Sequence, residues 1–256
     1  KIKKGDLHTP IFLSTNDEFH QLAHSMDEMR KGLLERDHIK KTFSRYVSKP
    51  VLDKILEEKA EISLQGESRK ITVLFADIRG FTKLAEDLCP EKVVCLLNEY
   101  FGYMLDTIFA HKGTLDKFIG DGIMVEFGSP LHDPDQEKRA VNCAIAMQKT
   151  IAFLLKKWAE EKKPLLQIGI GIHTGHAIVG NIGTEERMEY TAIGDAVNVA
   201  ARIEKKTKDF KAPILVSEDT KSAIENDFSW KDLGYVELRG RKQPIKVFTL
   251  EQRHFL

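Results

Sequence analysis

The sequence predicts an α+β fold in which a ferredoxin-like βαββαβ domain follows a helical stalk. Two observations lead to this prediction. Apolar residues in the first sixty positions recur at steps of three and four, the period of a packed helix, whereas from Arg69 onward short β-branched runs alternate with long amphipathic stretches. Because no Pro-rich or Gly/Ser-rich linker divides the second part, we expect it to fold as one domain.

The apolar stripe of the stalk has the a/d spacing of helices that pack against one another. It comprises Phe19, Leu22, Met26, Met29 and Leu33. Asn16 is suited to cap the start of this helix. The next slot of the pattern holds Arg36, where the register falters, and Pro50 ends or kinks the segment. We therefore predict an amphipathic stalk that pairs with a second copy of the chain.

The first strand of the domain is predicted at residues 71–75, a β-branched and aromatic run that leads directly to Asp77. Gly80, Phe81 and Thr82 then turn the chain and offer backbone N–H groups before a helix, which suits phosphate binding. A long helix is expected from about Pro90, because proline fits a first helical turn and an apolar stripe follows it.

A hairpin is predicted next along the chain. Two short apolar runs, residues 114–119 and 123–127, flank a turn that contains Asp121 between two glycines, and an Asp-Gly pair in this setting indicates a tight connection. The remaining predicted elements of this domain core are a helix from near Pro134 to Glu160 and strands at residues 168–172 and 177–179.

Two acidic residues lie where these elements end. Asp77 closes the first strand and Asp121 lies in the hairpin turn, so the two carboxylates project at one sheet edge if the strand neighbours the hairpin. Magnesium prefers a few protein carboxylates together with phosphate oxygens, which points to a nucleoside triphosphate site with two metal ions. The competing interpretation is that Asp121 belongs to an ordinary Asp-Gly turn.

A second polar cluster follows Gly194 and Asp195, which read as a turn and cap opening a helix. Asn198 and Arg202 then lie one turn apart on the same helical face. The guanidinium of an arginine is suited to spread charge over a phosphoryl group. A merely solvated polar face is the alternative that the pattern leaves open.

The bulk composition excludes several classes of protein. Lys plus Arg and Asp plus Glu both total 39 in 256 residues, so there is no global basic field for nucleic acid, and any phosphate binding has to be local. Three cysteines without a CxxC pair argue against a disulfide framework or a structural zinc site and fit a reducing compartment. No uninterrupted apolar run reaches the roughly 18 to 20 residues of a membrane span. The start at Lys1 suggests a fragment of a longer protein.

Three ordered motifs resemble the class III nucleotidyl cyclases: residues 75–82, residues 117–122 and residues 198–202. The resemblance spans roughly Arg69 to Leu250. The first residues are similar to the second half of a HAMP domain, a relay from membrane helices, and residues 42–48 to the coupling helix that precedes many bacterial cyclase domains. The domains expected from these resemblances are a partial HAMP domain at 1–39, a coupling helix and linker at 40–66, and a cyclase catalytic domain at 67–254.

The resemblance to the cyclases implies a role for each motif residue. Two Mg²⁺ or Mn²⁺ ions per active site would be held by Asp77, Ile78 and Asp121. The adenine of ATP would be recognised by Lys117 and Thr191. Asn198 would orient the ribose, and Arg202 would stabilise the transition state. Lys117 with Thr191 favours ATP over GTP, because guanylyl cyclases typically carry an acidic residue and a small residue there.

The triphosphate is expected to contact Gly80, Phe81, Thr82 and a basic residue near the C-terminus. Arg241 occupies the place where the family commonly has a lysine, and Lys242 is the alternative. Without the resemblance, this stretch reads as a turn with a solvated basic rim between two final strands.

The family also implies a homodimer with two shared active sites. In each shared active site of this family, the carboxylates come from one subunit, and the lysine, threonine, asparagine and arginine come from the other. The HAMP resemblance implies an upstream membrane sensor and a cytoplasmic location in an inner-membrane-anchored bacterial receptor. The alternatives are a guanylyl cyclase, a catalytically silent nucleotide-binding dimerisation module, and a polymerase-like nucleotide transferase built on the same two carboxylates.

Overall fold

The computed structural model describes residues 6–14, 18–43, 66–184, 186–238, 241, 243–251 and 254, with the side chains of 40–43 excepted. The chain divides into two compact units, residues 1–57 and 58–256.

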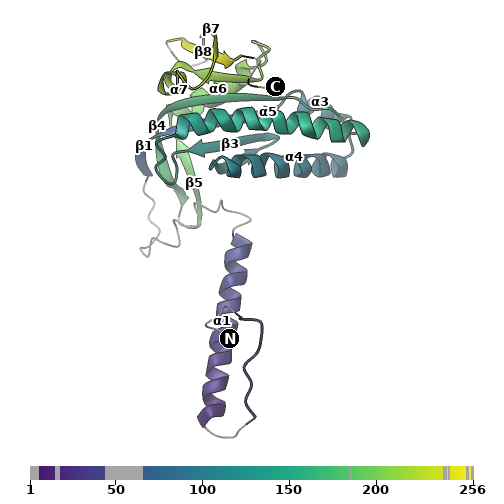
Figure 1. Ribbon diagram of the computed structural model, residues 1–256, viewed down its shortest axis with the longest axis vertical. Coiled ribbons are helices and arrows are strands. Elements are labelled where there is room, and N and C mark those ends of the chain that lie inside the picture. The colour runs from purple at the N-terminus through teal and green to yellow at the C-terminus, as the bar shows by residue number, and fades with distance from the viewer. Residues whose placement is uncertain are drawn as a thin grey trace. The chain divides into compact units, whose positions relative to one another are not determined.

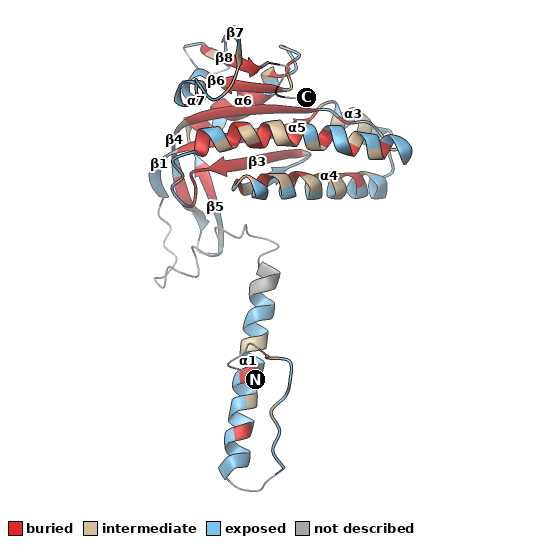
Figure 2. Cartoon of the chain, in the orientation of Figure 1, coloured by how far each residue is buried: buried red, intermediate tan, exposed pale blue. Residues whose placement is uncertain are grey.

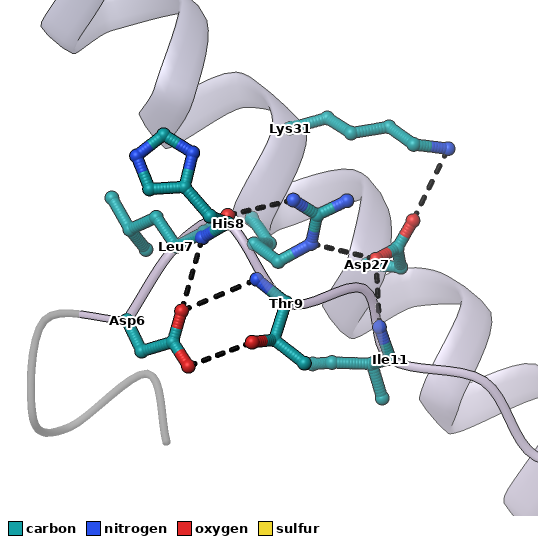
Figure 3. A network of polar contacts seen from close by, with 8 residues as sticks. Asp6, Leu7, His8, Thr9, Ile11, Asp27 and Lys31 are labelled. Carbon is teal, nitrogen blue, oxygen red and sulfur yellow. Dashed lines mark hydrogen bonds and ion pairs between the residues drawn. The ribbon is translucent and has the colours of Figure 1, made fainter.

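The N-terminal unit is built on α1 (Glu18–Phe43), which runs through Arg36 without interruption. An extended segment, residues 6–14, lies along this helix (Figure 3). Asp27 holds it by accepting the Ile11 N–H at 3.0 Å, while the buried Arg30 donates to the Leu7 carbonyl at 2.7 Å. The predicted stalk helix is confirmed over these residues, and the predicted Asn16 cap lies outside the part of the chain that the structure describes.

The predicted apolar seam of α1 is largely exposed within this unit, so most of the helix is pale blue in Figure 2. Phe19 is 66 % exposed, and Leu22, Met26 and Met29 are exposed as well. Exposed apolar side chains at a/d spacing are what a helix presents when its partner is another chain. Pairing of the stalk therefore stays a prediction.

The second unit is an α+β structure around a single eight-stranded sheet, as predicted. The strand order is β2-β3-β1-β4-β6-β8-β7, and β5 pairs with β4 beside this path. The strands are β1 (Gly66–Ile78), β2 (Thr114–Ile119), β3 (Gly122–Phe127), β4 (Ile168–Thr184), β5 (Arg187–Ile193), β6 (Ile214–Ser217), β7 (Trp230–Val236) and β8 (Ile245–Leu250). The helices are α3 (Phe81–Glu86), α4 (Pro90–Ala110), α5 (Gln136–Glu160), α6 (Asp195–Lys206) and α7 (Glu218–Ala223).

Helices α4 and α5 lie side by side across one face of the sheet (Figure 1). Tyr100 of α4 and Trp158 of α5 are fully buried and pack in one cluster with Leu74 and Ala76 of β1. By length and composition alone, α4 could cross a membrane, but here the side of α4 that carries Tyr100 and Met104 belongs to this core. The two long helices predicted from the sequence are thus confirmed.

One prediction about the sheet is wrong. The sequence pattern suggested separate strands at residues 168–172 and 177–179, whereas β4 is one strand of 17 residues. It pairs antiparallel with β1 from Ile78↔Ile168 to Gly66↔Gly180, and then with β5. This continuous ladder satisfies the backbone groups of Gly175 and its neighbours, which a sequence pattern reads as a break.

The opposite face of the sheet carries α6, and alternating glycines in β4 allow it to lie very close. Ile168, Ile170 and Ile172 point into the core with α4 and α5. Gly171 lies between two of them on the other face, and a Cβ added there would be 2.2 Å from the backbone nitrogen of Glu204. The missing side chain therefore sets the position of α6, the helix that carries Asn198 and Arg202.

Candidate active site

Two carboxylates meet where β1 ends beside the β2–β3 turn. β1 pairs with β3 through Ala76↔Ile123, which brings Asp77 next to the turn that carries Asp121. Asp121 accepts the backbone N–H of Ile78 at 3.3 Å, and a Cβ added to Gly122 would lie 3.2 Å from an Asp77 carboxylate oxygen. The sequence predicts both acids at one sheet edge if the first strand neighbours the hairpin, and the pairing of β1 with β3 meets this condition.

The electrostatics of this edge favour a cation. Burial raises the pKa of Asp77 above its usual range, and the charge of Asp121 and a hydrogen bond with it raise it further. Burial and the charge of Asp77 raise the pKa of Glu204 on α6 to about 7. The buried phenol oxygen of Tyr100 has no hydrogen-bond partner among the described residues, and burial and the same carboxylates raise its pKa. A bound cation would relieve this concentration of negative charge.

The donor set fits magnesium bound together with a phosphate-bearing ligand. Among the described residues, no group of three or more His, Cys, Asp or Glu side chains is arranged to hold a metal by itself. Magnesium, however, usually takes one or two carboxylates and completes its shell with water and substrate phosphates. The Ile78 side chain is buried in the core, so Ile78 could contribute only a backbone oxygen.

The segment after Asp77 forms a short helix with an open first turn. Gly80 caps α3 with a φ of 71°, a left-handed conformation that glycine adopts without strain, and it brings no side chain to accept the first N–H groups. Phe81 packs against the core and Thr82 is exposed. The predicted turn before a helix is present, and contact of its N–H groups with phosphate stays a prediction.

Lys117 and Thr191 are brought together between β2 and β5. Lys117 pairs with Glu189 of β5 at 2.5 Å and lies 3.5 Å from Asp116. Burial lowers the pKa of Lys117, but the hydrogen bond and charge of Glu189 together with Asp116 outweigh it, so the net shift is upward. Thr191 is buried and donates its hydroxyl proton to Asp116 at 2.5 Å.

Two acids under this pair were not among the residues that the sequence singled out. The side chain of Asp116 is only 1 % exposed, and Glu126 of β3 is buried to the same extent. Burial raises the pKa of Glu126 well above its usual range, and a hydrogen bond with Asp116 and the Asp116 charge raise it further. The available signal was an acid inside a β-branched run, Glu126 between Val125 and Phe127, which is unusual for a strand buried on both faces.

Asn198 and Arg202 lie on α6, one turn apart as predicted. Asn198 is exposed, and its side-chain amide donates to the Gly194 carbonyl at 3.2 Å. Arg202 is half-buried. Glu204 follows Arg202 by two residues, which is roughly 200° around a helix, and faces the Asp77 side of the sheet. The position of Arg202 on α6 is therefore nearly opposite that of Glu204.

Arg241 lies in the connection between β7 and β8, in agreement with the predicted turn between two final strands. It is exposed and forms an ion pair with Asp195 at the start of α6, at 3.3 Å. Lys242, the alternative phosphate contact, lies outside the described residues. The ion pair places a guanidinium next to the helix that carries Asn198 and Arg202.

Sequence similarity shows the family to which the chain belongs. The sequence model of the adenylate and guanylate cyclase catalytic domain matches residues 64–252, and the HAMP domain matches residues 1–35. The chain belongs to the class III nucleotidyl cyclases. It is thus a lyase of the cyclase type, in a family whose domains act as dimers on a nucleotide and generally use divalent metals, and its HAMP domain places it in signal transduction.

Curated relatives of this class III cyclase share about a third of its residues. Adenylate cyclase 1 of Rhizobium meliloti is 31% identical over 251 residues, which is 98% of this chain and 37% of that protein. An uncharacterized protein of Mycobacterium tuberculosis is 33% identical over 255 residues, 99% of this chain and 43% of its own length. The chain therefore spans less than half the length of these relatives.

Solved structures of cyclases match the catalytic part. The adenylyl cyclase CyaB from P. aeruginosa is 38% identical with a TM-score of 0.69, over 74% of this chain and 97% of that one. The guanylyl cyclase Cya2 is also 38% identical, with a TM-score of 0.66, over 73% and 93%. Since both activities occur among structures of equal identity, the family alone does not decide between ATP and GTP.

Proposed function

We propose that this class III cyclase converts ATP into 3′,5′-cyclic AMP and pyrophosphate as a homodimer with two shared active sites. The observation that carries the proposal is the division of the site residues within one chain. Asp77 and Asp121 form one group, whereas Arg202 lies on α6 nearly opposite Glu204, the residue of that helix that faces them. No hydrogen bond or ion pair between described residues joins the two carboxylates to Lys117, Thr191 or Asn198. A second copy of the chain can complete both half-sites by symmetry.

The proposed reaction is an intramolecular phosphoryl transfer. The ribose 3′-hydroxyl oxygen attacks the α-phosphorus in line, the bond to the bridging oxygen of the leaving pyrophosphate breaks, and the hydroxyl proton is lost to solvent. Two Mg²⁺ or Mn²⁺ ions held by Asp77, Asp121 and the backbone of Ile78 would neutralise phosphate charge and lower the pKa of the attacking hydroxyl. Asn198 of the partner subunit would orient the ribose, and Arg202 of the partner subunit would stabilise the charge that develops on the phosphoryl group.

The phosphates would be held by groups with little side-chain bulk and by one guanidinium. The N–H groups after Gly80, at Phe81 and Thr82, can donate to phosphate oxygens, because the glycine cap leaves them without a side-chain acceptor. Arg241 would contact the β- and γ-phosphates after exchanging Asp195 for the nucleotide.

Preference for ATP is supported by the pair Lys117 and Thr191. An ammonium group can donate to N1 of adenine, and the threonine oxygen can accept from its amino group. Guanylyl cyclase activity is the second candidate, because Cya2 is as similar in sequence as CyaB.

The product of the reaction tests this proposal. The full chain is incubated with ATP or GTP, with Mg²⁺ or Mn²⁺, and the products are separated by chromatography and identified by mass spectrometry. Cyclic AMP and pyrophosphate in equal amounts are expected from ATP, with much less cyclic GMP. Predominant cyclic GMP would favour the second candidate, nucleotide binding without product would indicate a silent module, and a linear nucleotide-transfer product would indicate a transferase.

The parent protein is proposed to be a membrane-anchored receptor with a cytoplasmic cyclase output. The support for this is the HAMP match at residues 1–35 and the greater length of the curated relatives. Signals from an upstream sensor would reach the catalytic dimer through α1.

A further inference from the structure

We propose that Asp116, backed by Glu126, fixes the direction of the Thr191 hydroxyl proton and thereby makes the base site selective for adenine. Asp116 and Glu126 would be positioning residues that act through Thr191. The inference rests on the proposed function insofar as Thr191 faces the base of the bound nucleotide.

The geometry leaves the Thr191 proton a single strong acceptor. The hydroxyl donates to one carboxylate oxygen of Asp116 at 2.5 Å, and the backbone N–H of Ala192 lies 3.4 Å from the same oxygen. The Asp116 side chain is 1 % exposed, so little water competes for that oxygen. Hydrogen bonds to a buried carboxylate are shorter and stronger than bonds between neutral groups, and this one ties β5 to β2.

A hydroxyl whose proton is engaged can only accept from a ligand. Threonine has one O–H and two lone pairs, and with the proton directed to Asp116 the oxygen offers only lone pairs to a base. Adenine presents an amino group at C6, which donates, whereas guanine presents a carbonyl oxygen at C6, which accepts. Guanine would therefore place two acceptors face to face, and a site built to pair with a polar group discriminates strongly against a base that leaves it unpaired.

Glu126 is a second buried acid beside Asp116. It lies fully buried on β3, and one oxygen of each of the two carboxyl groups is buried without a hydrogen-bond partner among the described residues. Burial, followed by the interaction with Asp116, raises the pKa of Glu126 to about 8, so Glu126 favours its neutral form at pH 7 and adds no second charge beside Asp116. The other charged groups that face this pair are Lys117, 3.5 Å from Asp116, and Glu189, which holds that lysine from β5.

The test is the base preference of the full chain measured in two ways. The first is the ratio of kcat/KM for ATP to that for GTP. The second is the ratio of the dissociation constant of 3′-deoxy-GTP to that of 3′-deoxy-ATP, two nucleotides that lack the attacking hydroxyl. Asp116→Asn is expected to lower both ratios at least tenfold. The asparagine amide can donate to the Thr191 oxygen, so that the hydroxyl proton of Thr191 points toward the base instead. Asp106→Asn, the same change at an exposed position of α4, is the matched control and is expected to keep both ratios within about threefold.

A double-mutant cycle separates this role from a structural one. In a Thr191→Val background, Asp116→Asn should cause no further loss of preference, because there is no hydroxyl left to direct. Asp116→Ser provides a second variant should Asp116→Asn fail to fold, since its shorter side chain cannot reach Thr191, and it must lower the same ratios. Unchanged ratios in either folded variant, or an equal loss of both nucleotides, would overturn the inference.

The binding measurement and the turnover measurement together also separate this inference from the proposed function. A wild-type chain that binds 3′-deoxy-ATP in preference to 3′-deoxy-GTP but forms no cyclic nucleotide contradicts the proposed activity alone. Preferential binding that survives Asp116→Asn contradicts the inference alone. A wild type that prefers guanine in both measurements contradicts both.

Discussion

At the scale of single residues, this protein buries acids where their charge has a cost. Asp77 and Glu204 lie near the end of β1, and Glu126 lies beside Asp116, each with a raised pKa for which burial is the first cause. Buried carboxyl groups with strongly perturbed pKa values are common at sites that bind or select a ligand. These residues therefore connect the stability of the domain to pH.

The contribution of Glu126 to stability is expected to fall as pH rises. Its folded-state pKa is raised, so the folded state holds a proton that the unfolded chain releases above about pH 4.5. The stabilisation is present in full below that pH and is lost as pH rises through the folded-state pKa, with a slope of at most about 1.4 kcal/mol per pH unit. Urea unfolding at pH 5, 6, 7 and 8 should show a steeper decline for wild type than for Glu126→Gln.

The comparison of these two proteins isolates Glu126 from other titrating groups. Burial lowers the pKa of His173 to about 4, so this residue makes stability rise with pH through the acidic range, opposite to Glu126. That contribution is the same in both variants and cancels in their difference. Parallel pH profiles would show that Glu126 does not carry the extra proton.

At the scale of elements, the contact between β4 and α6 determines the position of the helix that carries Asn198 and Arg202. The alternation of isoleucine and glycine in β4 gives one strand two different faces, a bulky one for the core and a flat one for α6. Such a pattern predicts a strand and also indicates that α6 can pack closely against its glycine face.

Gly171→Ala is expected to lower both stability and turnover. Its Cβ would meet the Glu204 backbone at 2.2 Å, so α6 has to shift and carry Asn198 and Arg202 with it. Overpacking of this kind typically costs about 1–3 kcal/mol. Thermal unfolding and cyclase assays of the variant check the prediction.

Gly102→Ala is the matched control for this substitution. Gly102 is an exposed residue of α4 around which a Cβ would meet nothing within 4 Å. Alanine should stabilise this helix by up to about 1 kcal/mol and leave turnover unchanged. Equal behaviour of the two variants would mean that the approach of α6 to β4 does not position the catalytic residues.

The register of α1 gives a second prediction at this scale. A single alanine inserted after Arg36 rotates everything downstream by about 100°, which should change turnover severalfold if the stalk relays a signal. An insertion of seven residues returns the apolar stripe to within about 20° of its original face and should recover most of the activity. Turnover that is the same in wild type and in both insertion variants would remove the stalk from the mechanism.

At the scale of the whole molecule, the proposed shared site makes a quantitative prediction for mixtures. Under the proposal, Asp77→Ala removes a metal ligand and Arg202→Ala removes charge stabilisation, so each homodimer alone should be inactive. In a heterodimer, both defects fall in one site and the other site is intact. Random mixing should therefore restore roughly a quarter of the wild-type activity per chain.

The mixing experiment is checked by cyclic nucleotide formation after the two proteins are unfolded together and refolded. The control is each variant refolded alone at the same total concentration. An inactive mixture that sediments as a dimer would contradict a site assembled from two chains.

Much of this protein can be predicted from local sequence. The hairpin around Asp121, the two long helices and the helix that follows Gly194 all depend on turn chemistry and apolar periodicity, which short segments carry by themselves. The ordered motifs also identified the family, because their residue types follow from what a metal and a triphosphate require. Arg202 was placed on one helical face with Asn198 by spacing alone.

Other features were decided only by the tertiary structure. Gly175 reads as a break in a sequence, but continuous pairing with β1 carries β4 through it. Asp116 reads as one more polar neighbour of Lys117, and Glu126 as an irregularity in a strand, until β2, β3 and β5 enclose them together. The physical reason is that periodicity and turn chemistry act over a few residues, whereas burial, proton sharing and the direction of a hydroxyl depend on partners that lie up to 75 positions away in the chain.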